Sequence, residues 1–180
     1  MKKFKGIFAV VLLSLALISC KNGSEIDVSK IEVNKESNQD MSKKLLAPKI
    51  ELIDINGKKK TLEDLKGKIV IVNFFKTWNI ENVKEIPNII SVESDYKNKN
   101  IEALFINIGE KPEEVKEFIK EQSIATCNIL LDPKEEVKKS YNVESLPTTY
   151  IIDKDGYVFA RLAKPTTKEE ITNIIEGMLQ

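Results

Sequence analysis

The side chains that most often carry catalysis are scarce in this chain. Its 180 residues contain two cysteines, Cys20 and Cys127, and no histidine. The lack of histidine excludes histidine-based acid–base catalysis, a Ser-His-Asp triad and histidine-ligated metal sites. Two cysteines are too few for a disulfide framework or a cysteine-based zinc site. We therefore expect no metal and no other cofactor.

Charge and composition narrow the class of protein further. Lysine plus arginine and aspartate plus glutamate both total 28, so the chain as a whole does not attract nucleic acid. The 42% of apolar and 31% of charged residues are ordinary for a soluble globular domain. The length suits one domain preceded by an address segment.

The address segment lies at the N-terminus. Three lysines within the first five residues precede an apolar stretch, residues 7–18. At about 12 residues this stretch is shorter than the ~20 that span a bilayer as a helix. It ends in Leu17-Ile18-Ser19-Cys20, which resembles a bacterial lipobox. The resemblance implies a signal peptide over residues 1–19, a lipid on Cys20 and an extracytoplasmic place in the bacterial cell envelope; an uncleaved anchor is the alternative.

Residues 20–46 are expected to tether the domain to the membrane. Asparagine, serine, lysine and glutamate dominate this stretch, and it has few aromatic residues. Such a composition cannot bury enough apolar surface to offset its ordering entropy, which favours a flexible tether. A globular domain is then expected over residues 47–180.

The stretch from Lys68 to Pro87 organises the domain. Residues 69–75 form an apolar run rich in β-branched and aromatic residues, which is typical of a strand buried on both faces. A short turn through Trp78 follows, and a helical pattern runs from about residue 81 to 97. Pro87 lies inside that pattern and should kink the helix.

The remaining pattern alternates strands with helices and closes with a hairpin and a helix. This order predicts an α/β fold with a mixed sheet covered on both faces. The expected strands are 50–55, 101–108, 129–131, 148–152 and 157–163. The expected helices are a turn at 61–65, one from 112 that includes 115–119, 133–141 with Asp132 as its cap, and 167–179.

The strand, Trp78 turn and helix resemble the active-site motif of the thioredoxin superfamily, and of its membrane-tethered ResA/TlpA type of thiol-disulfide oxidoreductase in particular. That type carries Trp-Cys-x-x-Cys at the turn and Lys-Glu-x-Pro in the helix. Here Trp78 and Lys84-Glu85-Ile86-Pro87 match, but Asn79 and Asn82 stand at the cysteine positions. The resemblance implies a thioredoxin-like fold with the extra helix and strand of this type.

Two further segments fit the same family pattern. Leu146-Pro147-Thr148-Thr149 matches the cis-proline loop opposite the turn, and Glu110 takes the place of the family's acidic residue. Both also have structural interpretations: Pro147 would be cis in any member of the fold, and Glu110 could be a solvated turn carboxylate. Asparagine is a strong N-cap, so Asn79 is also expected to stabilise the start of the helix.

Three functions fit these residues. The first is a non-redox domain that binds an extended peptide or envelope protein through Trp78, Asn79, Asn82, Pro147 and Thr148. The second is a thiol-disulfide oxidoreductase or peroxidase-like enzyme acting through Cys127 alone, although a cysteine just before a short strand more often behaves as a buried apolar residue. The third is a scaffold whose groove binds no ligand.

Overall fold

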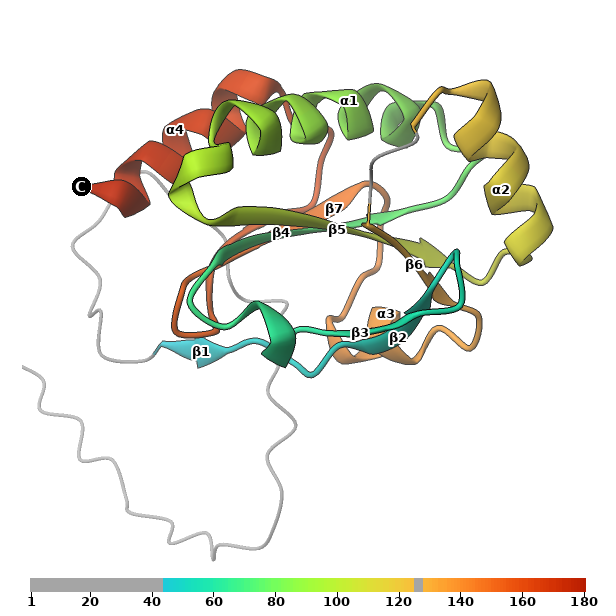
Figure 1. Cartoon of the computed structure of the whole chain (residues 1–180), viewed down its shortest axis with the longest axis horizontal. Helices are drawn as coiled ribbons and strands as arrows, with labels where there is room; N and C mark the ends of the chain where they lie inside the picture. The colour runs from blue at the N-terminus through green and yellow to red at the C-terminus, as the bar shows by residue number, and fades with distance from the viewer. Residues whose placement is uncertain (1–43, 125–127) are drawn as a thin grey trace, which may run out of the picture.

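The computed structural model describes residues 44–124 and 128–180 (Figure 1). The expected signal peptide, the lipidation position Cys20, most of the tether and Cys127 lie outside the described residues. None of the helices in the described part is long and apolar enough to cross a membrane.

One mixed sheet organises the described residues. Its strand order is β1-β8-β7-β4-β5-β6-β2-β3. Strand β4 pairs in parallel with β5, and β5 with β6, whereas the other neighbours are antiparallel. The strands are β1 (Leu45–Leu46), β2 (Glu51–Asp54), β3 (Lys59–Thr61), β4 (Ile69–Phe75), β5 (Ile101–Ile108), β6 (Asn128–Asp132), β7 (Thr148–Ile152) and β8 (Tyr157–Leu162).

Helices cover both faces of the sheet. Helices α1 and α4 lie side by side over one face, with α2 beyond the N-terminal end of α1, and α3 lies on the other side (Figure 1). The helices are α1 (Ile80–Asp95), α2 (Pro112–Glu121), α3 (Glu136–Ser140) and α4 (Lys168–Leu179), with 3-10 turns η2 (Glu63–Leu65) and η3 (Lys97–Lys99). The predicted α/β architecture is confirmed.

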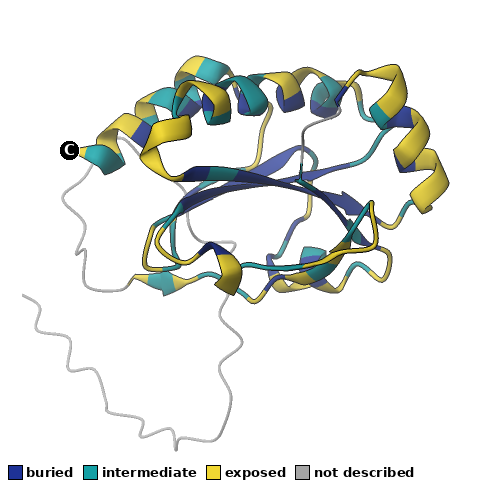
Figure 2. Ribbon diagram, viewed as in Figure 1, coloured by how far each residue is buried: buried dark blue, intermediate teal, exposed yellow. Residues whose placement is uncertain are grey.

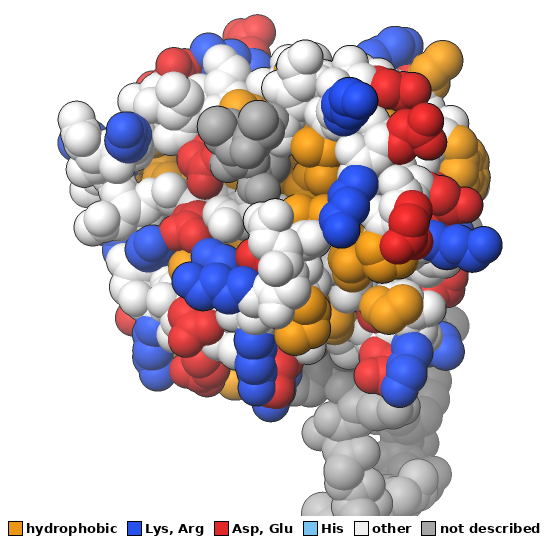
Figure 3. Space-filling model, turned by 45° about the vertical axis from the view of Figure 1, so that its right-hand side comes forward, with side chains coloured by type: hydrophobic (Ala, Val, Ile, Leu, Met, Phe, Trp, Pro, Cys, Tyr) orange, Lys and Arg blue, Asp and Glu red, His pale blue; other side chains and the backbone are white. Residues whose placement is uncertain are grey.

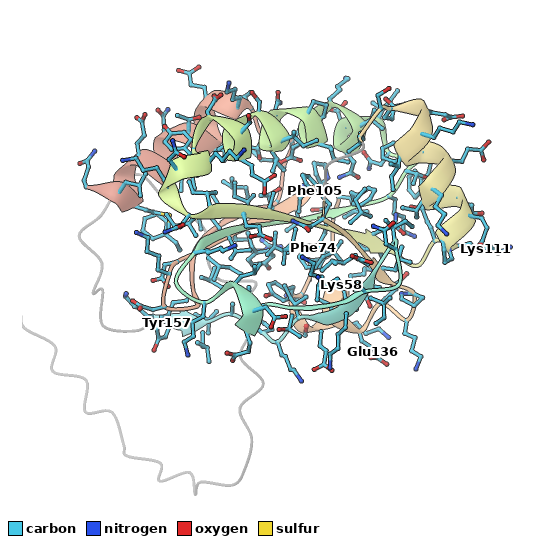
Figure 4. All side chains as sticks on the ribbon, in the orientation of Figure 1. Lys58, Phe74, Phe105, Lys111, Glu136 and Tyr157 are labelled. Carbon is cyan, nitrogen blue, oxygen red and sulfur yellow. The ribbon has the colours of Figure 1, made fainter. Side chains whose placement is uncertain are left out.

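The central strand β4 separates two hydrophobic cores. All seven of its residues are buried, as expected for a strand covered on both faces (Figure 2). Because side chains alternate along a strand, Ile69 and Ile71 pack into the core beneath α1 and α4, whereas Val70 and Val72 pack into the other core. Figure 4 shows the same division for Phe105 and Phe74, which lie on opposite faces.

The third helix begins later than the sequence predicts. We expected it at Pro133, but α3 starts at Glu136. The carboxylate of Asp132 accepts hydrogen bonds from the backbone N–H groups of Glu136 (3.0 Å) and Lys138 (2.8 Å), and Glu135 adopts a left-handed φ of 56°. Residues 133–135 therefore form a turn that precedes the helix. Asp132 stabilises the helix start from three positions before the N-cap residue, Glu135.

The edges of the sheet hold strands that the pattern did not predict. Strand β1 pairs Leu45 with Val158 and Leu46 with Tyr157, so the sheet includes two residues that precede the expected boundary at 47. Strand β3 pairs with β2 across a turn at Asn56-Gly57, where the left-handed φ of Gly57 (84°) suits glycine. Such short edge strands show little alternation of apolar and polar residues, so the sequence pattern does not predict them.

Candidate functional site

The turn between β4 and α1 is built around Asn79. We call residues 76–80, together with the first turn of α1, the Trp78 turn. The side chain of Asn79 accepts hydrogen bonds from the backbone N–H groups of Glu81 (3.0 Å) and Asn82 (3.2 Å). It thereby satisfies two of the free donors at the helix start, which confirms the predicted N-cap.

Asn82 joins the end of the strand to the helix. Its side chain is fully buried, and its Nδ2 donates to the carbonyl of Phe74 (3.2 Å), while its Oδ1 accepts from the backbone N–H of Lys76 (3.4 Å). Both ends of the amide are therefore occupied inside the protein. The expectation that Asn82 contacts a ligand is wrong for this conformation, because the side chain has no access to solvent.

The expected proline loop lies beside the turn. The Leu146–Pro147 bond is cis, and Nδ2 of Asn79 lies 3.5 Å from the carbonyl oxygen of Leu146, at the long limit of a hydrogen bond. Thr148 is fully buried and its hydroxyl donates to the carbonyl of Ser145 (2.7 Å). The hydroxyl of Thr148 is thus turned inward, contrary to its expected role as a ligand contact.

Glu110 anchors the other side of the turn. Its carboxylate accepts hydrogen bonds from the backbone N–H (2.8 Å) and the hydroxyl (2.7 Å) of Thr77, and from the side-chain amide of Asn107. The preceding Gly109 has a left-handed φ of 69°, which glycine adopts readily. The Glu110 carboxylate therefore holds the Trp78 turn in place.

A second carboxylate, Glu85, lies buried beneath the turn. It is 1% exposed, and burial raises its pKa from 4.5 to about 7. Its Oε1 accepts from the hydroxyl of Thr149 (3.0 Å), and the side-chain amide of Asn73 donates to the same hydroxyl oxygen (2.9 Å). Its Oε2 has no hydrogen-bond partner among the described residues.

No role of Glu85 was predicted from the sequence. Its position provided a signal: Asn82, Glu85, Ile86 and Ile89 share the helix face that points into the protein, because residues three and four apart are neighbours on a helix. A glutamate on that face must be buried. Its neighbours Asn73 and Thr149 lie on strands β4 and β7. The sequence alone does not predict that these two residues meet beneath α1.

Two apolar side chains project from the turn into solvent. Trp78 is 71% exposed and Ile80 is 68% exposed, the two highest values among large hydrophobic residues in the described chain. Nζ of Lys76 lies 5.8 Å from the centre of the Trp78 ring, within range of a cation–π interaction. Figure 3 shows hydrophobic side chains reaching the surface of the face that includes this end of the molecule. These two side chains supply the largest exposed fractions among the large apolar side chains of the described chain.

The hydrogen bonds of Asn82 predict a loss of stability when they are removed. The substitution Asn82→Ala leaves the Phe74 carbonyl and the Lys76 N–H without this partner in a buried place, so we expect the free energy of unfolding to fall by about 1–3 kcal/mol. Urea unfolding at neutral pH measures the change. Asn98→Ala, in the exposed η3 turn, is the control and should stay within about 0.5 kcal/mol of the parent chain. Equal effects of the two substitutions would contradict the bridging role of Asn82.

The sequence and the fold of this chain match known proteins. The model of the AhpC/TSA family matches residues 44–161, which spans both the Trp78 turn and the Pro147 loop. The chain belongs to the AhpC/TSA family. Its fold is thioredoxin-like: a thiol:disulfide interchange protein of the thioredoxin family from Chlorobium tepidum TLS superposes with a TM-score of 0.69 at 26% identity, covering 77% of this chain and 99% of that one.

Curated relatives of this AhpC/TSA member are thiol-disulfide oxidoreductases. A ResA protein of Bacillus cereus is 33% identical over 187 residues, covering 100% of this chain and 98% of the relative. ResA of Bacillus subtilis (strain 168) is 35% identical over 158 residues, covering 88% of this chain and 85% of the relative. The predicted resemblance to the ResA/TlpA type is thereby confirmed, and the chain is related to enzymes of thiol and disulfide chemistry.

Proposed function

We propose that this AhpC/TSA member is a non-redox binding domain, and that the Trp78 turn and the Pro147 loop recognise an extended segment of a protein or peptide. One observation carries the proposal. The two side chains at the motif's cysteine positions are amides that serve as a helix cap and a buried bridge, while apolar groups beside them face solvent. An amide cannot be oxidised or form a mixed disulfide.

The binding surface is smaller than the set of residues that the sequence suggested. Trp78 and Ile80 supply exposed apolar area, and a Trp side chain anchors partners well because it buries a large surface. Asn79 is partly exposed beside them. The carbonyl of Leu146 receives only one long contact from Asn79, so it remains able to accept a hydrogen bond from a partner backbone.

The partner is expected in the cell envelope. The proposed lipid on Cys20 would hold the domain at a membrane surface, and the residues between Cys20 and β1 would set its reach. A chaperone, adaptor or assembly factor for envelope proteins fits this placement, because such proteins bind exposed segments of incompletely folded chains.

A disulfide-reduction assay tests the non-redox part of the proposal. We expect the purified full chain to reduce insulin disulfides no faster than buffer with the same reductant, since the turn contains no thiolate to attack a disulfide. A relative with two cysteines at the turn serves as the positive control. Turnover comparable with that relative would contradict the proposal; loss of such turnover in Cys127→Ala would then support the single-thiol alternative.

Site-specific crosslinking tests the binding part. A photoreactive residue at position 80 should capture envelope proteins in cells that express the full chain, because that side chain is exposed beside Trp78. The matched control carries the same residue at position 159, where Phe159 is also exposed but lies on β8. Adding Trp78→Ala should reduce capture at position 80 several-fold. Equal capture from both positions, or capture that ignores Trp78→Ala, would indicate a surface without specific recognition.

A further inference from the structure

A cavity of about 350 Å³ lies at the opposite end of the sheet from the Trp78 turn. Three segments line it: residues 46–49, residues 62–70 and the β7–β8 turn at 152–156. Two of the elements that contribute lining residues, β1 and the η2 turn, lie near each other on one side of the sheet (Figure 1). Strand β4 begins at this cavity and ends at the Trp78 turn, so the length of the strand separates the two sites.

The floor of the cavity is apolar. Leu65, Val70 and Ile152 are buried there, and they belong to the core on this side of the sheet. The apolar lining is completed by Leu46, Ala47 and Leu62. The volume is at the lower end of the ~300–1,000 Å³ typical of small-molecule pockets. A single aliphatic chain is therefore a better match in size than a two-chain lipid.

Two lysines at the rim, Lys66 and Lys154, lie on loops that contact each other, and neither has a carboxylate partner among the described residues. The backbone N–H of Gly67 donates to the carbonyl of Lys154 (3.0 Å), which joins the loop of Lys66 to the loop of Lys154. Both lysines are exposed, and neither forms an ion pair with another described residue. The other two rim lysines each pair with a glutamate. Lys66 and Lys154 are thus available to hold an anionic group.

Carboxylates at the same rim limit how much negative charge a ligand can carry. Glu63, Asp153 and Asp155 line the cavity with the lysines. Asp153 is already engaged, because its carboxylate accepts from the backbone N–H groups of Asp155 (3.0 Å) and Tyr157 (2.9 Å) and lies 3.4 Å from Nζ of Lys44. Glu63 and Asp155 would repel a dianion. Among the described residues, the unpaired rim groups are thus two lysines and two carboxylates, and this balance disfavours the dianion of a phosphate monoester more than the single charge of a carboxylate.

We propose that this cavity binds a single-chain aliphatic carboxylate, with its hydrocarbon chain on the apolar floor and its carboxylate between Lys66 and Lys154. A charged pair of donors at the mouth and an apolar interior match the two ends of such a ligand. The site is independent of the Trp78 turn and does not depend on the function proposed for that turn.

Photolabelling of the full chain tests the site. The probe is decanoate with a diazirine in its chain, and the labelled residues are mapped by mass spectrometry. We expect labels within residues 62–70 and 152–156, suppressed by unlabelled decanoate at least about 10-fold more effectively than by 1-decanol, since the alcohol lacks the charge that the lysines hold. Labels confined to other segments, or equal competition by the alcohol, would overturn the proposal.

Charge reversal at the rim provides the matched variant. Lys66→Glu with Lys154→Glu should lower labelling of these segments by about 10-fold or more, because the carboxylate would then face two like charges. Both lysines are exposed, so the fold should tolerate the change. The control variant, Lys116→Glu with Lys139→Glu, changes the net charge by the same amount at two exposed positions outside the cavity. It should leave labelling unchanged. Unchanged labelling in the first variant, or an equal loss in both, would show that the rim lysines do not hold the ligand.

Discussion

The double substitution Asn79→Cys with Asn82→Cys is expected to give this protein a disulfide-reducing activity that we do not expect of the parent chain. The oxygen of Asn79 already accepts from two backbone N–H groups at the start of α1. A thiolate in the same place would receive those donors and the positive end of the helix dipole, which lowers a cysteine pKa. Because removal of a nucleophile from other enzymes costs up to about 10⁶-fold in rate, we expect a gain of roughly 100-fold or more over background.

The insulin assay measures this gain, and two single substitutions control it. Asn79→Cys alone should form mixed disulfides without efficient turnover, because no second thiol releases the product. Asn82→Cys alone should be inactive, because that position is fully buried. Thermal unfolding of each variant verifies that it is folded. A folded double variant with no activity would show that the frame around the Trp78 turn has lost more than its two sulfurs.

The stability of the protein is expected to fall as the pH rises from about 4.5 to 7. The pKa of Glu85 is raised from 4.5 to about 7 by burial, so the folded state binds this proton more tightly than the unfolded chain. The stabilisation is complete below pH 4.5 and is lost as pH rises through 7. A pKa difference of this size corresponds to about 3 kcal/mol.

Urea unfolding across this pH range, compared with the Glu85→Gln variant, isolates the contribution of Glu85. The amide retains an oxygen for the hydroxyl of Thr149 but does not ionise, so the stability of the parent relative to the variant should decline by up to about 3 kcal/mol between pH 4.5 and 7.5. Glu117 is exposed on α2, so the free energy of unfolding of Glu117→Gln should differ from that of the parent by the same amount at every pH. A parent-minus-variant difference for Glu85→Gln that does not change with pH would refute the burial of a neutral carboxyl group there.

Ionisation of Glu85 would act on the end of the molecule that carries the Trp78 turn. Its hydrogen-bond partner Thr149 follows the Pro147 loop by two residues, and Asn73 lies two residues before the end of β4. A charge at this position has to be solvated by the same elements that hold the Trp78 turn. We therefore expect the turn to loosen before the rest of the sheet as the pH rises above 7.

Long, strongly patterned elements were predictable from the sequence. The β-branched run of β4 and the apolar run of β5 each determine a strand, because uninterrupted hydrophobic residues need cover on both faces. The caps of short elements were less predictable. Asp132 does stabilise the start of α3, but across a turn, because a carboxylate can accept from any N–H within reach. Neither the two-residue β1 nor the lysine-rich β3 has a hydrophobic period.

The sequence by itself determined that the turn has no thiol and that Asn79 caps the helix, since both depend only on residue type and local spacing. Only the tertiary structure decided which polar groups reach solvent. Asn82 and Thr148 are sealed inside while Trp78 and Ile80 project outward, because the direction of a side chain at a turn depends on what packs against it. The same holds for Glu85: Asn73 and Thr149 belong to strands distant in sequence, and the sheet alone brings them together beneath the turn.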